Sequence, residues 1–133
     1  MPNVLLVDDD PSMRQIWRIG LRLTGFSISE AEDGQDALEK IEQSRPDVVI
    51  MDVMMPGMDG ISALKALRAA ASTADLPVII VTAKSSREAV RDCLAAGANR
   101  YLTKPVSRQA LLDNIQEVLR EAGHSSNGND DGD

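Results

Sequence analysis

The sequence predicts an α/β protein in which a parallel sheet of five strands carries helices on both faces. Two observations lead to this prediction. Short apolar runs alternate five times with longer segments whose apolar residues recur at helical spacing, and strands joined by helices form parallel sheets with right-handed crossovers. Val48 to Met51 is apolar at every position, as expected of a central parallel strand buried on both faces.

The expected strands end at polar or turn-forming residues. The first runs into three consecutive aspartates, the second alternates apolar and polar residues, and Pro46 precedes the third, which ends at Asp52. The fourth is apolar throughout, and Lys104-Pro105 closes the fifth. These strands are expected over 3–7, 26–31, 48–52, 77–82 and 100–103.

Capping residues mark the five helices. Asp10 is expected to cap the first helix, with Pro11 at the first helical position, where its missing N–H costs nothing. Asp33, Ser85 or Ser86, and Ser107 are expected caps of later helices, and Gly25 and Gly97 end the first and fourth. Residues at helical spacing are Met13, Ile16, Ile19, Gly20 and Leu23, then Ala37, Leu38 and Ile41, then Ile61, Leu64 and Leu67, then Ala89, Val90, Cys93 and Leu94, expected to face inward, and finally Leu111, Leu112, Ile115, Val118 and Leu119.

Length and composition favour one globular domain. The chain has 133 residues, of which 43% are apolar and 26% charged, enough for a single core. We expect residues 1–121 to fold and 122–133, rich in Gly, Ser, Asn and Asp, to form a disordered acidic tail or linker. The net charge of −7 argues against direct nucleic-acid binding by this chain. A single cysteine, no apolar run of membrane-spanning length and no evident signal peptide favour a cytoplasmic protein that does not contact membranes.

Chemistry-bearing residues lie at or just beyond the ends of four of the predicted strands. They are Asp8 and Asp9, Asp52, Thr82 and Lys104. The carboxyl ends of parallel strands lie at one edge of the sheet, where ligands of open α/β folds bind. Three carboxylates gathered there repel one another unless a cation intervenes. Oxygen ligands without His or Cys favour Mg²⁺ over zinc.

These motifs together resemble the receiver domain of two-component response regulators. The resemblance rests on Val7-Asp8-Asp9, on Asp52 followed by Met-Met-Pro-Gly-Met-Asp-Gly, on Thr82-Ala83 and on Lys104-Pro105, and it covers about residues 3–121. No single motif is specific, but their combination at the ends of the appropriate strands is. The family has a flavodoxin-like (βα)5 doubly wound fold, which implies the strand order 2-1-3-4-5.

The resemblance implies a Mg²⁺-dependent phosphorylation. Asp52 would be the phosphoacceptor that takes a phosphoryl group from a histidine kinase or a histidine phosphotransfer protein. Asp9, Asp52 and the Met54 backbone carbonyl would bind Mg²⁺, for which Mn²⁺ can substitute, and Asp8 would act through water. The chain would be no enzyme beyond catalysing its own phosphorylation and autodephosphorylation.

The resemblance also implies a conformational switch. Lys104 would pair with Asp52 and then with a phosphoryl oxygen, and Thr82 would hydrogen-bond another. Movement of Thr82 would vacate space that Tyr101 fills. Met54 and Lys84 occupy positions that modulate dephosphorylation in this family, and we expect the bulky Met54 and the cationic Lys84 to make it slow.

The output is expected to be a downstream protein target that binds through the fourth helix, fifth strand and fifth helix. Asn99-Arg100 and Val106 depart from the pattern of many DNA-binding regulators, which weakens a winged-helix-type dimer through that face. Lys104-Pro105 is expected to be a cis peptide bond, Met51 to point into the core, Trp17 to pack or lie at the surface, and Cys93 to be a small core residue.

Three other function classes stay open from the residues alone. A hydrolase or phosphotransferase with an aspartyl-phosphate intermediate usually needs a second acid two residues beyond the nucleophile, where this chain has Met54. A flavin- or nucleotide-binding module needs a phosphate cradle, whereas Asp8-Asp9-Asp10-Pro11 would repel phosphate. A phosphorylation-independent receiver-like scaffold is the remaining alternative, although such proteins tend to lose a pocket residue and none is missing here.

Overall fold

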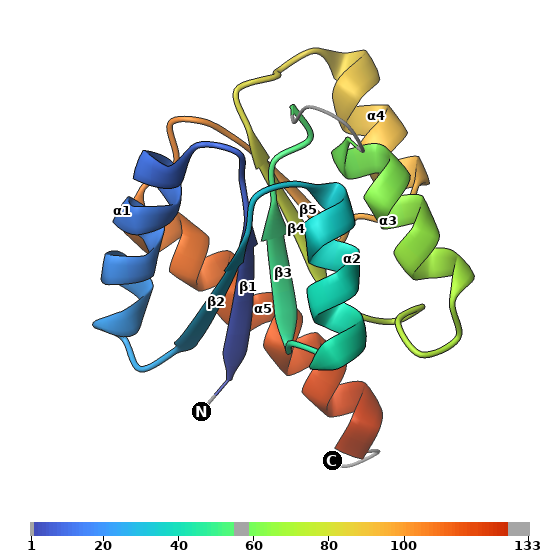
Figure 1. Cartoon of the computed structure of the whole chain (residues 1–133), viewed down its shortest axis with the longest axis horizontal. Helices are drawn as coiled ribbons and strands as arrows, with labels where there is room; N and C mark the ends of the chain where they lie inside the picture. The colour runs from blue at the N-terminus through green and yellow to red at the C-terminus, as the bar shows by residue number, and fades with distance from the viewer. Residues whose placement is uncertain (1, 55–58, 128–133) are drawn as a thin grey trace.

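The computed structural model describes residues 2–54 and 59–127 and confirms the α/β class (Figure 1). Five parallel strands form one sheet in the order β2-β1-β3-β4-β5. The elements are β1 (Asn3–Val7), α1 (Pro11–Arg22), β2 (Ser27–Ala31), α2 (Gly34–Gln43), β3 (Val48–Met51), α3 (Gly60–Ala69), β4 (Val78–Thr82), α4 (Arg87–Ala95), β5 (Arg100–Thr103) and α5 (Arg108–Asn127). Expected and observed strand bounds differ by at most one residue.

Two apolar cores lie on the two faces of the sheet. On one face the strands pack against α2, α3 and α4, with Leu64 and Cys93 fully buried and Met51 pointing into this core as expected. On the other face Trp17 of α1 and Leu111 of α5 pack against the strands. Every residue of β3 and β4 is buried, which explains why these two strands are continuous apolar runs.

The predicted capping residues begin the helices. The side chains of Asp10, Asp33 and Ser86 accept hydrogen bonds from backbone N–H groups in the first turns of α1, α2 and α4, so Ser86 rather than Ser85 caps the fourth helix. The Ser107 hydroxyl accepts from the Ala110 N–H at the start of α5. Gly97 has a φ of 112° after α4, a left-handed conformation that other residues adopt only with strain.

The apolar stripe expected on the first helix divides in the structure. Trp17 and Leu21 are buried, whereas Ile16, Ile19 and Leu23 are 60%, 53% and 74% exposed. Helix α1 carries apolar side chains over a wider arc than the sheet and α5 cover. Leu94 of α4, which was expected to face inward, is also exposed, because α4 turns Ala89 and Cys93 toward the sheet instead.

The last helix is longer than expected. The sequence placed the end of the folded segment at residue 121, but α5 continues to Asn127. The apolar stripe stops before this point, yet loss of apolar residues removes packing rather than helical backbone geometry, and no proline interrupts 122–127. Residues 55–58 and 128–133 lie outside the described residues. No described helix is both long and apolar enough to cross a bilayer.

Candidate functional site

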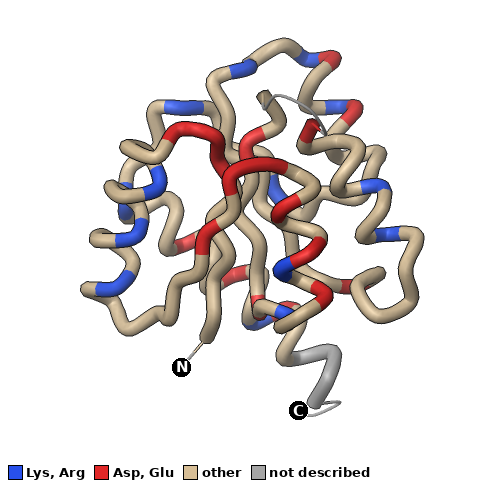
Figure 2. Tube along the Cα trace, in the orientation of Figure 1, with Lys and Arg blue, Asp and Glu red and all other residues tan. Residues whose placement is uncertain are grey.

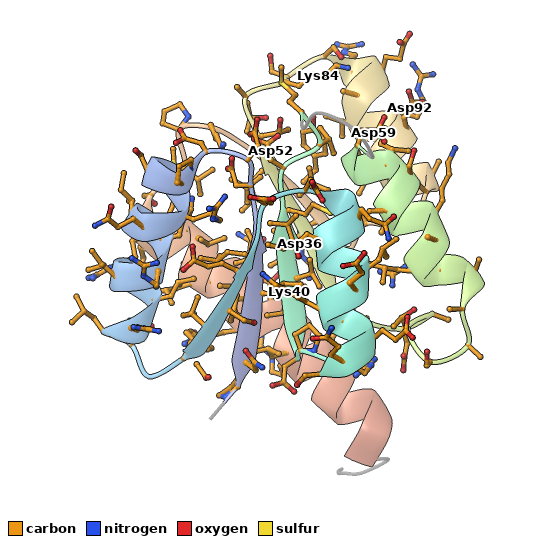
Figure 3. All side chains as sticks on the ribbon, viewed as in Figure 1. Asp36, Lys40, Asp52, Asp59, Lys84 and Asp92 are labelled. Atoms are coloured by element: carbon orange, nitrogen blue, oxygen red, sulfur yellow. The ribbon has the colours of Figure 1, made fainter. Side chains whose placement is uncertain are left out.

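The carboxyl ends of the strands bring the predicted residues to one edge of the sheet. Asp8 directly follows β1, Asp52 follows β3, Thr82 ends β4 and Lys104 follows β5. Figure 2 shows acidic segments gathered at this edge, and Figure 3 shows Asp52 near the end of β3. Residues far apart in the chain thus form one constellation, as the sequence predicted.

Lys104 bridges two buried carboxylates. Its Nζ donates to Asp52 Oδ2 at 2.9 Å and to Asp8 Oδ2 at 3.1 Å, while both aspartates are buried. The pairing with Asp52 was expected; the pairing with Asp8 was not. The peptide bond between Lys104 and Pro105 is cis, as predicted.

Burial and charge oppose each other at this bridge. Burial raises the pKa of Asp8 above its usual value, although the Asp10 N–H and Lys104 act in the lowering direction. Burial alone would lower the pKa of Lys104, but its hydrogen bonds to Asp52 and Asp8 outweigh that effect and raise it. The ammonium is therefore held in its charged form between the carboxylates at neutral pH.

The Asp52 side chain is also fixed from its own strand end. Asp52 Oδ1 accepts a hydrogen bond from the Met54 backbone N–H at 2.8 Å, and the Asp52 N–H donates to the Val7 carbonyl at 3.0 Å. The Met54 side chain is exposed. Gly60, the first residue of α3, lies closely against this segment: a Cβ there would lie 2.7 Å from the Val53 Cα and 2.9 Å from the Asp52 carbonyl oxygen.

Thr82 and Tyr101 are joined through the backbone of Lys84. Thr82 is fully buried, and its hydroxyl accepts from the Lys84 N–H at 3.4 Å. The Tyr101 hydroxyl donates to the Lys84 carbonyl at 2.5 Å, and its half-buried ring packs against the core. Burial, with Cys93 and Asp52 nearby, raises the pKa of Tyr101, which keeps the hydroxyl protonated as a donor.

The oxygen donors at this edge suit a hard cation. Asp8 and Asp52 present adjacent buried carboxylates and Asp9 lies exposed beside them. Within 2–54 and 59–127, no three Asp, Glu, His or Cys side chains converge as a ready metal cage. Mg²⁺ does not need one, because it commonly binds through one or two carboxylates and keeps several waters. The residues therefore fit Mg²⁺ held by few protein ligands.

Arg14 is a neighbour of the site that sequence reasoning missed. It donates to the backbone carbonyl of Asp8 through Nη1, and its Nε donates to Glu30 of β2 at 3.1 Å. Arg18 pairs with the same glutamate. The i,i+4 spacing of Arg14 and Arg18 on a helix that follows the acidic residues was the available signal, but their shared partner comes from another strand.

A family comparison identifies the domain. The model of the response regulator receiver domain matches residues 4–116. The chain belongs to the response regulator receiver family. The resemblance to response regulator receiver domains is therefore confirmed. Receiver domains are signalling modules of two-component systems. Receiver domains in general use Mg²⁺ for phosphorylation and interact with histidine kinases and output domains.

Curated relatives of this receiver are response regulators. Response regulator MprA of Mycolicibacterium vanbaalenii is 40% identical over 118 residues, covering 89% of this chain and 50% of that protein. MprA of Mycobacterium leprae is also 40% identical, covering 89% of this chain and 51% of its own length. The receiver chain thus spans about half the length of the curated relatives it matches.

Solved structures support the same fold. The chemotaxis protein CheY4 of Vibrio cholerae has a TM-score of 0.84 and 37% identity, with 89% of this chain and 98% of that chain covered. A CheY-like receiver domain protein from Methanospirillum hungatei has a TM-score of 0.88 and 29% identity, with 94% and 98% covered. The flavodoxin-like strand order 2-1-3-4-5 predicted from sequence is therefore confirmed.

Replacing Lys104 with methionine is expected to lower the free energy of unfolding by about 1–3 kcal/mol at pH 7, because two buried carboxylates lose their shared cation. The raised pKa of Lys104 means that its contribution is complete below the pKa of an unfolded lysine and is lost as the pH rises through the folded value. The measurement is urea unfolding in EDTA from pH 6 upward into the alkaline range. Lys65→Met, on the exposed face of α3, is the control, and an equal loss in that variant would contradict the assignment.

Proposed function

We propose that this receiver domain accepts a phosphoryl group on Asp52 and acts as a phosphorylation-dependent switch. A carboxylate oxygen of Asp52 forms the new bond to phosphorus while the bond from phosphorus to the donor imidazole nitrogen breaks, and the donor histidine leaves as imidazole. The product is an acyl phosphate. The chain needs no further enzymatic activity beyond promoting its own phosphorylation and the hydrolysis of the resulting acyl phosphate.

The observation that carries this proposal is the Asp8–Lys104–Asp52 bridge. Lys104 lies 2.9 Å from the Asp52 carboxylate, within reach of a phosphoryl oxygen built on that carboxylate. Phosphoryl transfer depends mainly on positioning and on neutralising the charge of the transferred group. We propose that Asp9, Asp52 and the Met54 carbonyl hold Mg²⁺, with Asp8 acting through water. When bound, the ion would supply positive charge for the phosphoryl oxygens.

The switch is proposed to run from Thr82 through Lys84 to Tyr101. A phosphoryl group adds about −1.5 to −2 charges and new acceptor oxygens, to which the Thr82 hydroxyl can donate. Because the Lys84 N–H is the present partner of that hydroxyl and the Lys84 carbonyl is the partner of Tyr101, movement of Thr82 would disturb both bonds. The response is a shift between two pre-existing conformations.

Two partner surfaces follow from this proposal. The exposed apolar residues of α1 line a groove of about 690 Å³ that reaches Lys104, so a phosphodonor helix seated there would lie beside the acceptor. Its lining includes Met13, Ile16, Ile19, Leu23, Pro105 and Val106. The downstream target is proposed to bind across α4, β5 and α5, where Leu94 is exposed beside Arg91.

The scaffold alternative is less well supported. A phosphorylation-independent scaffold gives no reason for a lysine to bridge two buried carboxylates, since a buried ion pair is weak evidence for stability. A hydrolase with an aspartyl-phosphate intermediate would need a second acidic residue at position 54, where this chain has Met54. The Asp8–Lys104–Asp52 bridge at this edge is used fully only by the switch.

Incubation with Mg²⁺ and acetyl phosphate is expected to add one phosphoryl group to the wild type and none to Asp52→Asn, because the amide is not a nucleophile. Intact-mass spectrometry with and without EDTA measures the adduct. Asp59→Asn, which preserves an N-cap side chain on α3, is the matched control and should be phosphorylated normally. No adduct on the wild type with any donor, with Mg²⁺ binding intact, would favour the scaffold.

The Met54→Asn and Lys84→Glu variants are expected to shorten the lifetime of the phosphorylated protein several-fold. The smaller polar side chain would admit and orient water, and the carboxylate would replace a cation beside the pocket. The measurement is decay of the phosphorylated form after the donor is removed. An unchanged lifetime in both variants would remove the proposed modulating role of these two residues.

Ile19→Glu is expected to slow phosphorylation by a cognate histidine kinase or phosphotransfer protein about tenfold or more, because a buried apolar contact at the interface becomes a charge. Phosphorylation by acetyl phosphate should stay unchanged, since that donor needs no docking surface. Gln15→Glu, an exposed change on the same helix, is the control. The donor is chosen as the fastest on the wild type from a panel, and an equal slowing with acetyl phosphate would contradict docking at α1.

A further inference from the structure

Arg14 is tied at once to the acidic loop and to the edge strand. Its Nη1 donates to the backbone carbonyl of Asp8, and its Nε donates to Glu30 Oε1 at 3.1 Å. Only 16% of the Arg14 side chain is exposed. A planar guanidinium can satisfy two acceptors in a fixed relative geometry, which a lysine ammonium on a flexible stem does not reproduce.

The carbonyl that Arg14 binds belongs to the peptide between Asp8 and Asp9. Asp8 is otherwise fixed by its N–H, which donates to the Ala31 carbonyl at 3.2 Å, and by its carboxylate, which accepts from the Asp10 N–H and Lys104. Asp9 has an exposed side chain. The direction in which the Asp9 carboxylate approaches the site therefore depends on the orientation of the peptide that Arg14 holds.

Glu30 keeps the Arg14 guanidinium in place. Burial would raise the pKa of Glu30, but hydrogen bonds from Arg18 and Arg14 outweigh it and lower the pKa, so the glutamate is ionised at neutral pH. Its charge also offsets that of Arg14. A cation beside the acidic loop would otherwise repel Mg²⁺, and the Glu30 carboxylate reduces this repulsion.

We infer that Arg14 is a positioning residue for the Mg²⁺ site, setting the orientation of the Asp8–Asp9 peptide from α1 with Glu30 of β2 as its anchor. This inference rests on the proposed Mg²⁺-dependent phosphorylation. It extends the site beyond the strand ends to a helix and to the edge strand β2. Loss of Arg14 leaves the Asp9 carboxylate free to adopt orientations that do not bind the ion.

The chain contains its own reporter for this test. Trp17, the single tryptophan, lines one small cavity together with Asp8, Arg14 and Asp52. Binding of a divalent cation at these carboxylates changes the electrostatic environment of the indole, so Mg²⁺ affinity can be followed by tryptophan fluorescence. Isothermal titration calorimetry gives a second measure that does not depend on Trp17.

The experiment compares Mg²⁺ dissociation constants of the wild type, Arg14→Gln, Arg14→Lys, Glu30→Gln and the control Arg18→Gln. Arg14→Gln is expected to weaken Mg²⁺ binding about tenfold, with Arg14→Lys recovering only part of the loss because it keeps the charge but not the fork. The Mg²⁺ affinity of Glu30→Gln should fall between those of the wild type and Arg14→Gln. Arg18→Gln should bind Mg²⁺ within twofold of the wild type, since Arg18 pairs with Glu30 without touching the acidic loop. Urea unfolding checks that each variant folds. If Arg14→Gln does not fold, the comparison rests on the Mg²⁺ affinity of Arg14→Lys.

Several results would overturn the inference. Tighter Mg²⁺ binding in Arg14→Gln would mean that charge repulsion outweighs positioning. Full recovery in Arg14→Lys would mean that charge alone matters, and equal weakening in Arg18→Gln would indicate a general effect on α1. If the wild type binds Mg²⁺ and Arg14→Gln binds it with the same affinity, only the role of Arg14 is refuted. If the wild type binds no Mg²⁺, the proposed metal chemistry is refuted as well.

Discussion

The ammonium of Lys104 lies between two buried carboxylates that come from different strands, and the edge of the sheet depends on that contact. Its partners are 96 and 52 residues away in the chain. Two buried aspartates side by side repel each other and pay a desolvation cost. One shared cation offsets both effects, so the ends of β1, β3 and β5 are linked by charge as well as by backbone hydrogen bonds.

The same arrangement prepares the site for chemistry. Under the proposed function, the ammonium that already neutralises Asp52 would remain beside it when a phosphoryl oxygen replaces a carboxylate oxygen as its partner, so little reorganisation would be needed. Thr82 is buried on β4, the strand between β3 and β5. Under the proposed switch, Thr82 would respond to the phosphoryl group and pass the change to Tyr101 through the backbone of Lys84.

Surface and site are coupled on the α1 side. The helix uses Trp17 and Leu21 for packing and Arg14 for the acidic loop, and it leaves Ile16 and Ile19 exposed. One helix thus presents its packing residues, Arg14 and its exposed apolar residues at different angular positions around its axis. This division explains why its apolar residues cover more of its circumference than a helix serving only the core would need.

The sequence by itself determined the alternation of strands and helices, most capping residues and the gathering of Asp8, Asp52, Thr82 and Lys104 at one edge, because these depend on local patterns or on the rule that parallel strands end at one edge. The strand order and the Asp52–Lys104 pair were predicted through the family resemblance. The sequence did not determine which side of α1 is exposed, that Leu94 faces outward, or that Lys104 also binds Asp8. Nor did it reveal the contact of Arg14 with the Asp8 carbonyl and Glu30. Tertiary structure decided these, because they depend on the rotation of each helix and on side chains that meet only when distant segments pack together.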